Sequence, residues 1–80
     1  MNGWIGVSRA QWAALASMRN GPALAPGKRR TRSSLIARGL IEPVGTPPQR
    51  WQLTAAGQIE LRGGDRRYLA DLKAYQRRAL

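Results

Sequence analysis

The stretch Ser33-Ser-Leu-Ile-Ala-Arg-Gly-Leu-Ile-Glu42, followed further along by Leu53-Thr-Ala-Ala-Gly57, decides the fold of this chain. A basic helix is predicted to end at Gly39, because glycine readily takes the left-handed conformation that follows a helix. Leu40 and the apolar residue after it then begin a strand. A second strand returns toward Thr54, which is a favourable N-cap for another helix. The order helix, strand, loop, strand, helix predicts an α+β fold.

Two short strands are predicted to form a hairpin in the middle of the chain. They cover residues 41–44 and 50–53, and the loop between them contains Pro47 and Pro48. Pro43 lacks the N–H group that an inner strand needs. Its strand is therefore expected at the edge of a two- or three-stranded ribbon.

A further helix is predicted to begin after Ser8. Ser8 and Gln11 fit a capping box, and Val7 and Trp12 occupy the two positions of a hydrophobic staple. The helix is expected to end at Gly21, which a proline follows.

The connection between this helix and the basic helix is short and rich in proline. Residues 21–27 are predicted to form a loop, or at most one turn of helix. The basic helix is expected over residues 28–38, with a thin apolar side centred on Leu35.

Helical sequence is also predicted after the hairpin. One helix is expected over residues 55–62, the pair Gly63-Gly64 is expected to break the chain, and Asp65 to cap a final helix.

We therefore divide the chain into an α+β domain of residues 1–62 and an amphipathic C-terminal helix within residues 63–80. This helix is expected to pack on the same domain or to form a homodimer interface, since the two Tyr and several Leu of its apolar stripe suit protein packing better than a membrane surface. The candidate dimer-interface residues are Tyr68, Leu69, Leu72 and Tyr75.

Length and composition exclude several classes of function. Eighty residues correspond to one small domain. The chain has no cysteine and no histidine, so it cannot form a disulfide, a thiolate zinc site or a histidine-based catalytic centre. Its four acidic residues are scattered along the chain. We therefore expect no catalytic residue, no metal, no cofactor and no enzymatic activity.

The charge balance is the main compositional feature. Fourteen Lys and Arg residues against four Asp and Glu give a net charge of +10. Such a charge attracts polyanions such as DNA, RNA or an anionic membrane. We see neither a signal peptide nor an apolar stretch long enough to span a bilayer, so we expect a cytoplasmic protein that does not bind membranes.

The basic run at the start of the second helix is the strongest candidate for contact with nucleic acid. Its cations oppose the helix dipole, which favours acidic side chains at this end of a helix. Phosphates would neutralise them, and arginine can also read guanine edges in the major groove. The alternative is a solvated basic face with no ligand. The candidate residues are Lys28, Arg29, Arg30, Arg32 and Ser33.

The loop of the hairpin is a second candidate. Its polar tip is expected to lie along phosphates or in a minor groove, where the negative potential is enhanced. An ordinary turn without a ligand is the alternative. The candidate residues here are Thr46, Gln49 and Arg50.

Residues 35–61 resemble winged helix-turn-helix regulators of the multiple-antibiotic-resistance (MarR) and PadR kind. The similarity rests on Leu35-Ile-Ala-Arg-Gly-Leu-Ile-Glu42 and Trp51-Gln-Leu-Thr-Ala-Ala-Gly57. It implies a small winged helix in which Arg29, Arg30 and Ser33 lie near the exposed face of a recognition helix and Arg50 lies on the wing. The core residues that it implies are Leu35, Leu40, Ile41, Trp51 and Leu53.

The chain also departs from that family. Residues 21–27 leave no room for the helix that precedes the recognition helix, and Lys28, Thr31 and Arg32 occupy positions that are usually apolar. There is no space for an effector pocket. The resemblance therefore implies a reduced winged helix without a ligand sensor.

Taken together, these features predict a basic protein that binds double-stranded DNA without catalysis, as a small bacterial or phage transcriptional regulator. Two alternatives stay open. One is a phage-type interaction protein that grips and inhibits a host nucleic-acid-handling complex, for example an anti-CRISPR. The other is RNA binding, since RNA rewards the same positive charge.

Overall fold

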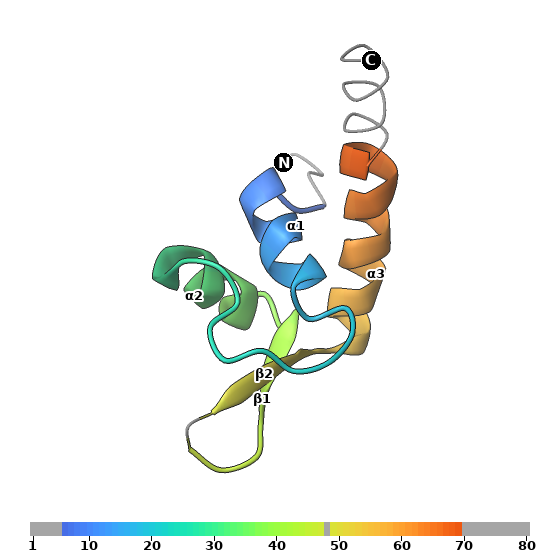
Figure 1. The fold of residues 1–80 in the computed structure, drawn as a ribbon. Helices are drawn as coiled ribbons and strands as arrows, with labels where there is room; N and C mark the ends of the chain where they lie inside the picture. The colour runs from blue at the N-terminus through green and yellow to red at the C-terminus, as the bar shows by residue number, and fades with distance from the viewer. Residues whose placement is uncertain (1–5, 48, 70–80) are drawn as a thin grey trace, which may run out of the picture.

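The computed structural model describes residues 6–47 and 49–69. The protein is α+β: two helices precede a two-stranded antiparallel hairpin and a third follows it, and the hairpin projects from one end of the helices, an arrangement consistent with a small winged helix (Figure 1). The described elements are α1 (Arg9–Ala16), α2 (Arg29–Ala37), β1 (Ile41–Val44), β2 (Arg50–Leu53), α3 (Ala55–Gly64) and a π-helical turn (Asp65–Leu69). The predicted fold class is confirmed.

The hairpin has the strand boundaries that were predicted, with Ile41 opposite Leu53 and Pro43 opposite Trp51. The backbone of Trp51 also exchanges two hydrogen bonds with Ala23, of 3.0 and 2.8 Å. Because the N–H and C=O of Trp51 both point to Ala23, the Pro43–Trp51 pair carries no ladder bond and Pro43 faces the open edge. Residues 21–28 contribute this bridge and no helix.

The junction of α2 and β1 explains the opening stretch of sequence. Gly39 has a φ of +72°, and its N–H donates to the Ile36 carbonyl at 3.0 Å. The N–H of Leu40 donates to the Leu35 carbonyl, also at 3.0 Å. This pair of bonds is a Schellman C-cap, as the sequence predicted.

The start of α3 is hydrogen-bonded to the same junction. The hydroxyl of Thr54 accepts from the Gly57 N–H at 3.0 Å and donates to the Gly39 carbonyl at 2.7 Å. A Cβ on Gly57 would overlap the carbonyl oxygen of Leu40. The pattern Thr-Ala-Ala-Gly therefore caps α3 and allows its first turn to lie directly on the backbone of the α2–β1 junction.

Helix α1 begins as predicted and ends earlier than predicted. The capping box is present: Ser8 Oγ accepts from the Gln11 N–H, and Gln11 Oε1 accepts from the Ser8 N–H. The helix ends at Ala16 rather than near Gly21: the N–H groups of Met18 and Arg19 donate to carbonyls three residues back, so residues 17–20 form tighter turns.

The core lies where α1, α2, α3 and the hairpin meet. Leu15 and Leu35 are fully buried at its centre. Leu40 and Ile41 are buried as predicted, whereas Trp51 and Leu53 are half-buried against the core. The buried apolar residues are Val7, Trp12, Ala14, Leu15, Met18, Leu35, Leu40, Ile41 and Leu61.

The predicted chain break at Gly63-Gly64 is wrong. Helix α3 runs through both glycines and continues into the π-helical turn, so Asp65 lies inside a helical stretch and is not an N-cap (Figure 1). Gly64 is buried, and a Cβ there would overlap the indole ring of Trp12. This glycine serves a close approach of α1 and α3 rather than a turn.

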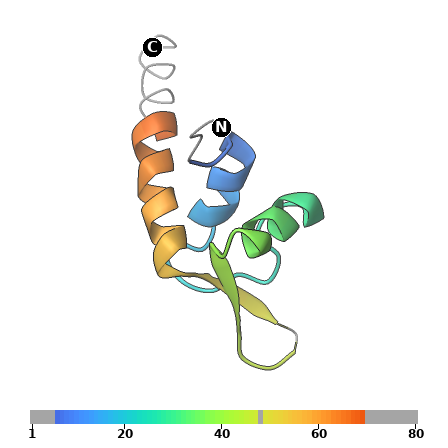
Figure 2. The same cartoon turned by 180° about the vertical axis from the view of Figure 1, so that it is seen from behind.

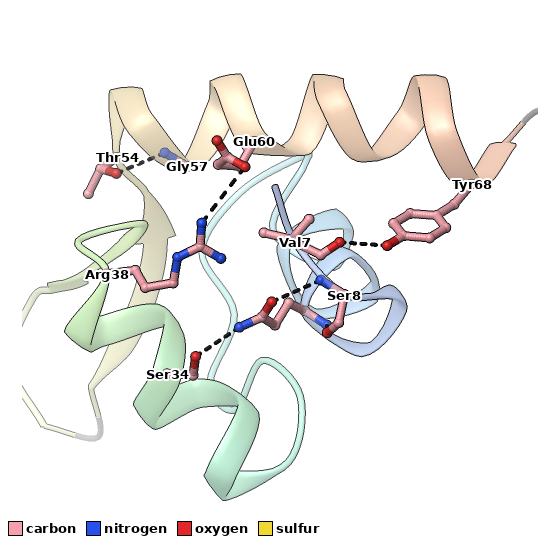
Figure 3. Close-up of polar contacts among 9 residues, drawn as sticks. Val7, Ser8, Ser34, Arg38, Thr54, Gly57, Glu60 and Tyr68 are labelled. Atoms are coloured by element: carbon pink, nitrogen blue, oxygen red, sulfur yellow. Dashed lines mark hydrogen bonds and ion pairs between the residues drawn. The ribbon is translucent and has the colours of Figure 1, made fainter. Parts of the chain in front are cut away.

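The candidate dimer-interface residues are only partly within the described chain. Tyr68 turns toward its own domain: its ring lies 5.3 Å from that of Trp12, and its hydroxyl donates to the Val7 carbonyl (Figure 3). Leu69 is 37% exposed. Leu72 and Tyr75 lie outside the described residues.

Candidate nucleic-acid interface

The outer side of α2 carries the first group of candidate residues. Arg29, Arg30 and Ser33 are exposed, and Leu35 is completely buried on the opposite side of the helix. The periodicity of the helix therefore separates one apolar anchor from a charged surface, as the sequence predicted. Lys28, immediately before the helix, is exposed as well.

Within α2, neither a capping side chain nor an acidic residue balances the positive end of the helix dipole. Lys28 occupies the N-cap position and makes no side-chain capping bond, and the first turn holds no acidic residue. The first backbone N–H groups of a helix and its dipole both favour a negative charge, yet here cations follow one another. An external anion near this end would satisfy both the backbone donors and the side chains.

Arg32 differs from its neighbours. It is half-buried, its Nη2 donates to the Gly27 carbonyl at 3.3 Å, and its buried Nε has no hydrogen-bond partner. Its side chain is folded back on the loop before α2. Of the basic run, the structure therefore brings Lys28, Arg29 and Arg30 to the open surface and holds Arg32 partly inside.

The contact between α1 and α2 is partly polar. The Gln11 amide that completes the capping box also donates from Nε2 to the Ser34 hydroxyl at 2.8 Å (Figure 3). At the other end of α2, Arg38 approaches Glu60 of α3 at 4.0 Å. Sequence reasoning did not identify Ser34 or Glu60 as partners, and no spacing within the chain connects them to Gln11 and Arg38.

The hairpin carries the second group of candidate residues. Thr46, Gln49 and Arg50 are all exposed. Arg50 lies opposite Val44, at the end of the paired strands, and Thr46 and Gln49 lie in the loop beyond it. Helix α2 and the hairpin project on the side of the molecule away from α3 (Figures 1 and 2). We call the surface formed by residues 28–30, Ser33, Thr46, Gln49 and Arg50 the α2–wing face.

The three acidic side chains of the described residues interact with groups outside the α2–wing face. Glu42 accepts a hydrogen bond from Gln52 at 2.8 Å, and Glu60 approaches Arg38. Both oxygens of Asp65 accept from Arg19 at 2.8 Å, and one also accepts from the Trp12 Nε1–H at 2.9 Å. Within residues 6–47 and 49–69, no carboxylate is within salt-bridge distance of a cation on the α2–wing face.

Pairing with Arg19 changes the pKa of the Asp65 carboxyl. The hydrogen-bonded Arg19 guanidinium lowers the pKa of the Asp65 carboxyl to about 2, with a smaller contribution from Trp12. The same hydrogen bond raises the pKa of Arg19. This pair joins the turn after α1 to the end of α3, so its charges hold the fold together and are not free for a ligand.

A second group of cations lies at the far end of the domain, with no carboxylate of residues 6–47 and 49–69 within salt-bridge distance. The guanidinium carbon of Arg9 lies 5.7 Å from the centre of the Tyr68 ring, and that of Arg67 lies 5.6 Å from it. Both residues and the adjacent Arg66 are exposed. Sequence reasoning treated Arg66 and Arg67 only as the polar side of a final helix.

The described residues contain no group of three acidic, histidine or cysteine side chains that could hold a metal ion. In the same part of the chain, none of the helices combines the length and apolar character needed to cross a membrane.

Comparisons of the chain with models of known protein families, with curated proteins and with solved structures found no match. The geometry and charge described above are therefore the basis for any functional conclusion.

Proposed function

We propose that this protein binds double-stranded DNA through the α2–wing face, without catalysis. The observation that carries the proposal is a surface with exposed Lys28, Arg29, Arg30 and Arg50 and no described carboxylate in salt-bridge range. Cations left without an internal partner favour an external polyanion. A protein surface intended only for solubility normally mixes both signs of charge.

In this proposal most contacts go to phosphates. Lys28 and the free N–H groups at the start of α2 would hold one backbone, and Arg50 on the hairpin would hold another. Arg29 and Arg30 lie on the exposed side of α2, where a guanidinium can read a guanine edge in the major groove. Arg32 contributes positive potential from its partly buried position rather than a full contact.

The biological role that fits this surface is a small transcriptional regulator of a bacterium or phage, acting in the cytoplasm. The arrangement of a basic helix followed by a two-stranded hairpin, which is consistent with a small winged helix, supports this role.

A binding titration tests the proposal. Fluorescence anisotropy of a labelled duplex at about 150 mM salt should show that Arg29→Gln, Arg30→Gln and Arg50→Gln together weaken binding on the order of 100-fold, since three phosphate contacts are lost. The charge-matched control replaces Arg9, Arg66 and Arg67 with Gln. It should change the affinity by less than about fivefold, because only long-range attraction is reduced.

Equal losses in both variants would mean that net charge alone drives binding, and no loss in the first variant would remove the α2–wing face from consideration. Circular dichroism should show both variants folded, since none of the six side chains is buried. A single-stranded RNA and an RNA duplex of the same length serve as competitors. Preference for either would replace DNA by RNA as the ligand.

A protein partner is the second candidate. Ile36 on α2 is 43% exposed and Leu24 in the loop before α2 is 51% exposed, so the segment that carries the cations also has exposed apolar side chains. Single exposed apolar residues are common on protein surfaces, and therefore DNA remains our first proposal. A stoichiometric partner that survives nuclease treatment of a bacterial lysate, combined with no DNA binding, would favour the inhibitor role.

A further inference from the structure

The arginines around Tyr68 form a second cationic surface that the α2–wing face does not use. We call Arg9, Arg66 and Arg67 the Tyr68 cluster. Arg9 comes from the first turn of α1, and the other two come from the π-helical turn after α3. Residues from two ends of the described chain are therefore brought together only by folding.

The Tyr68 ring beneath Arg9 and Arg67 is held in place by two contacts. The Tyr68 ring packs at 5.3 Å from the Trp12 ring, and its hydroxyl donates to the Val7 carbonyl (Figure 3). Arg9 and Arg67 lie over this ring at 5.7 and 5.6 Å. A guanidinium held over an aromatic ring keeps its N–H donors available at the rim and loses less rotamer entropy when it binds an oxyanion.

No described acid neutralises this cluster. Asp65 is adjacent in sequence, but its two oxygens already accept from Arg19 and Trp12. Glu60 lines the same depression as Arg66 and Arg67, but its described salt bridge is to Arg38 at 4.0 Å and not to an arginine of the cluster. The first turn of α1 contains no acidic residue. The cluster therefore has the same property that marks the α2–wing face: exposed arginines whose charge finds no carboxylate in the described chain.

The two surfaces lie at different ends of the molecule. The start of α1 and the end of α3 lie together at the end opposite the hairpin, and both views agree on this (Figures 1 and 2). The packed α1–α3 pair separates the Tyr68 cluster from the hairpin. A single straight duplex held by α2 and the hairpin would leave the cluster facing away.

We infer that the Tyr68 cluster binds the phosphate backbone of a second DNA segment, so that one molecule bridges two duplexes. This inference rests on the proposed function, because the first duplex is held by the α2–wing face. The contact is to phosphates and carries no sequence preference. With about three cations against about four and without the helix N-terminus of α2, the second surface binds DNA more weakly, and it acts once the first duplex is bound.

A two-duplex capture experiment tests the inference. A biotinylated duplex on beads is saturated with protein, washed, and offered a fluorescent duplex of unrelated sequence at about 50 mM salt. The wild-type protein should retain the fluorescent duplex. The variant with Arg9, Arg66 and Arg67 replaced by Gln should load onto the beads like the wild type and retain at least tenfold less of the second duplex.

Replacement of the same three residues by Lys is the matched control, since an ammonium also pairs with phosphate as a point charge. It should restore capture to within about threefold of the wild type. Full capture by the Gln variant would overturn the inference and would assign bridging to a dimer that uses two α2–wing faces. Protein that loads onto the beads but captures no second duplex would also overturn it, while leaving the proposed function intact.

Failure of the wild type to load onto the first duplex would instead overturn the proposed function. A parallel arm offers vesicles of phosphatidylcholine with about one-third phosphatidylserine in place of the second duplex. Selective capture of vesicles, lost in the Gln variant, would replace nucleic acid by an anionic lipid surface as the partner and overturn the inference as stated.

Discussion

Helix α1 makes two contacts of opposite character. Against α3 it places Trp12 directly on Gly64, and Asp65 beside that glycine binds Trp12 and Arg19. Against α2 it offers the Gln11 amide to the Ser34 hydroxyl, and α2 itself buries only Leu35 (Figure 3). The first contact uses close packing and paired charges, and the second uses one apolar anchor and one polar bond.

This difference separates two uses of arginine in one small domain. Arg19 has a carboxylate partner and stabilises the α1–α3 pair. Arg29 and Arg30 have no described carboxylate near them and extend from a helix that the core holds lightly. The comparison predicts that substitutions at α1–α3 change stability, whereas substitutions on the outside of α2 change binding.

The largest expected effect comes from Gly64→Ala. Its Cβ would overlap the Trp12 indole, so α1 and α3 must move apart, and we expect a loss of about 2–4 kcal/mol in the free energy of unfolding. Gly63→Ala is the matched control. Nothing lies near its Cβ, and replacing a helical glycine by alanine should add up to about 1 kcal/mol.

Urea unfolding followed by circular dichroism measures both variants. Two variants of equal stability would show that α3 does not pack against α1 as described.

Asp65→Asn should have the next largest effect. The amide can still accept from the Trp12 N–H, but it loses the charge that binds Arg19. We expect a loss of about 1–2 kcal/mol at pH 7, less than the pKa shift alone implies, because the Arg19 side chain is 44% exposed and solvent screens the pair.

The pH dependence has a definite sign. The pKa of Asp65 is about 2 in the folded protein, below its value of about 3.9 in an unfolded chain. The carboxylate therefore contributes its full stability above about pH 4, and this contribution is lost as the pH falls toward 2. The difference in stability between wild type and Asp65→Asn should narrow over that window. A difference that stays constant from pH 6 to pH 2 would contradict the Arg19–Asp65 pairing.

Two single substitutions test whether Arg30 acts in DNA binding and Arg19 in stability. Arg30→Gln should weaken DNA binding about fivefold at 150 mM salt and leave thermal unfolding unchanged, since it removes one phosphate or base contact. Arg19→Gln should lower stability by about 1 kcal/mol and leave DNA affinity within about twofold. If Arg19→Gln weakened binding as much as Arg30→Gln, the two uses of arginine would not be distinct.

The smallest effect is expected at the contact between α1 and α2. Ser34→Ala removes the acceptor of the Gln11 amide, which lies partly in solvent, and should cost about 0.5–1 kcal/mol in urea unfolding. Ser33→Ala, one position away on the exposed side, is the control and should cost almost nothing. A loss above about 2 kcal/mol for Ser34→Ala would mean that α2 is held more firmly than one polar bond allows.

Local signals predicted much of this fold. The capping box at Ser8, the C-cap at Gly39 and both strands of the hairpin follow from residues within a few positions of one another, and they are confirmed. The role of Gly64 could not be predicted in the same way. Two adjacent glycines in a sequence predict a helix break. Only the packing of Trp12, which is far away in sequence, shows that Gly64 is needed for the close contact between α1 and α3.

The candidate site was predictable to a similar degree. The winged-helix resemblance implied that Arg29, Arg30 and Ser33 lie near the exposed face of the second helix, and their exposure agrees. Helical periodicity puts Arg32 on the side of Leu35, so its partial burial was within reach of the pattern. The Tyr68 cluster could not be predicted from the sequence, because Arg9 and Arg67 come to lie over the same ring only when α1 and α3 pack together.

The salt dependence of duplex binding tests the central claim most directly. If the four cations of the α2–wing face neutralise about four phosphates, the logarithm of the association constant should fall with the logarithm of salt concentration at a slope of roughly −3 to −4. The variant with Arg29, Arg30 and Arg50 replaced by Gln should reduce that slope to about −1. A wild-type slope near zero, or the same slope in both proteins, would contradict the account.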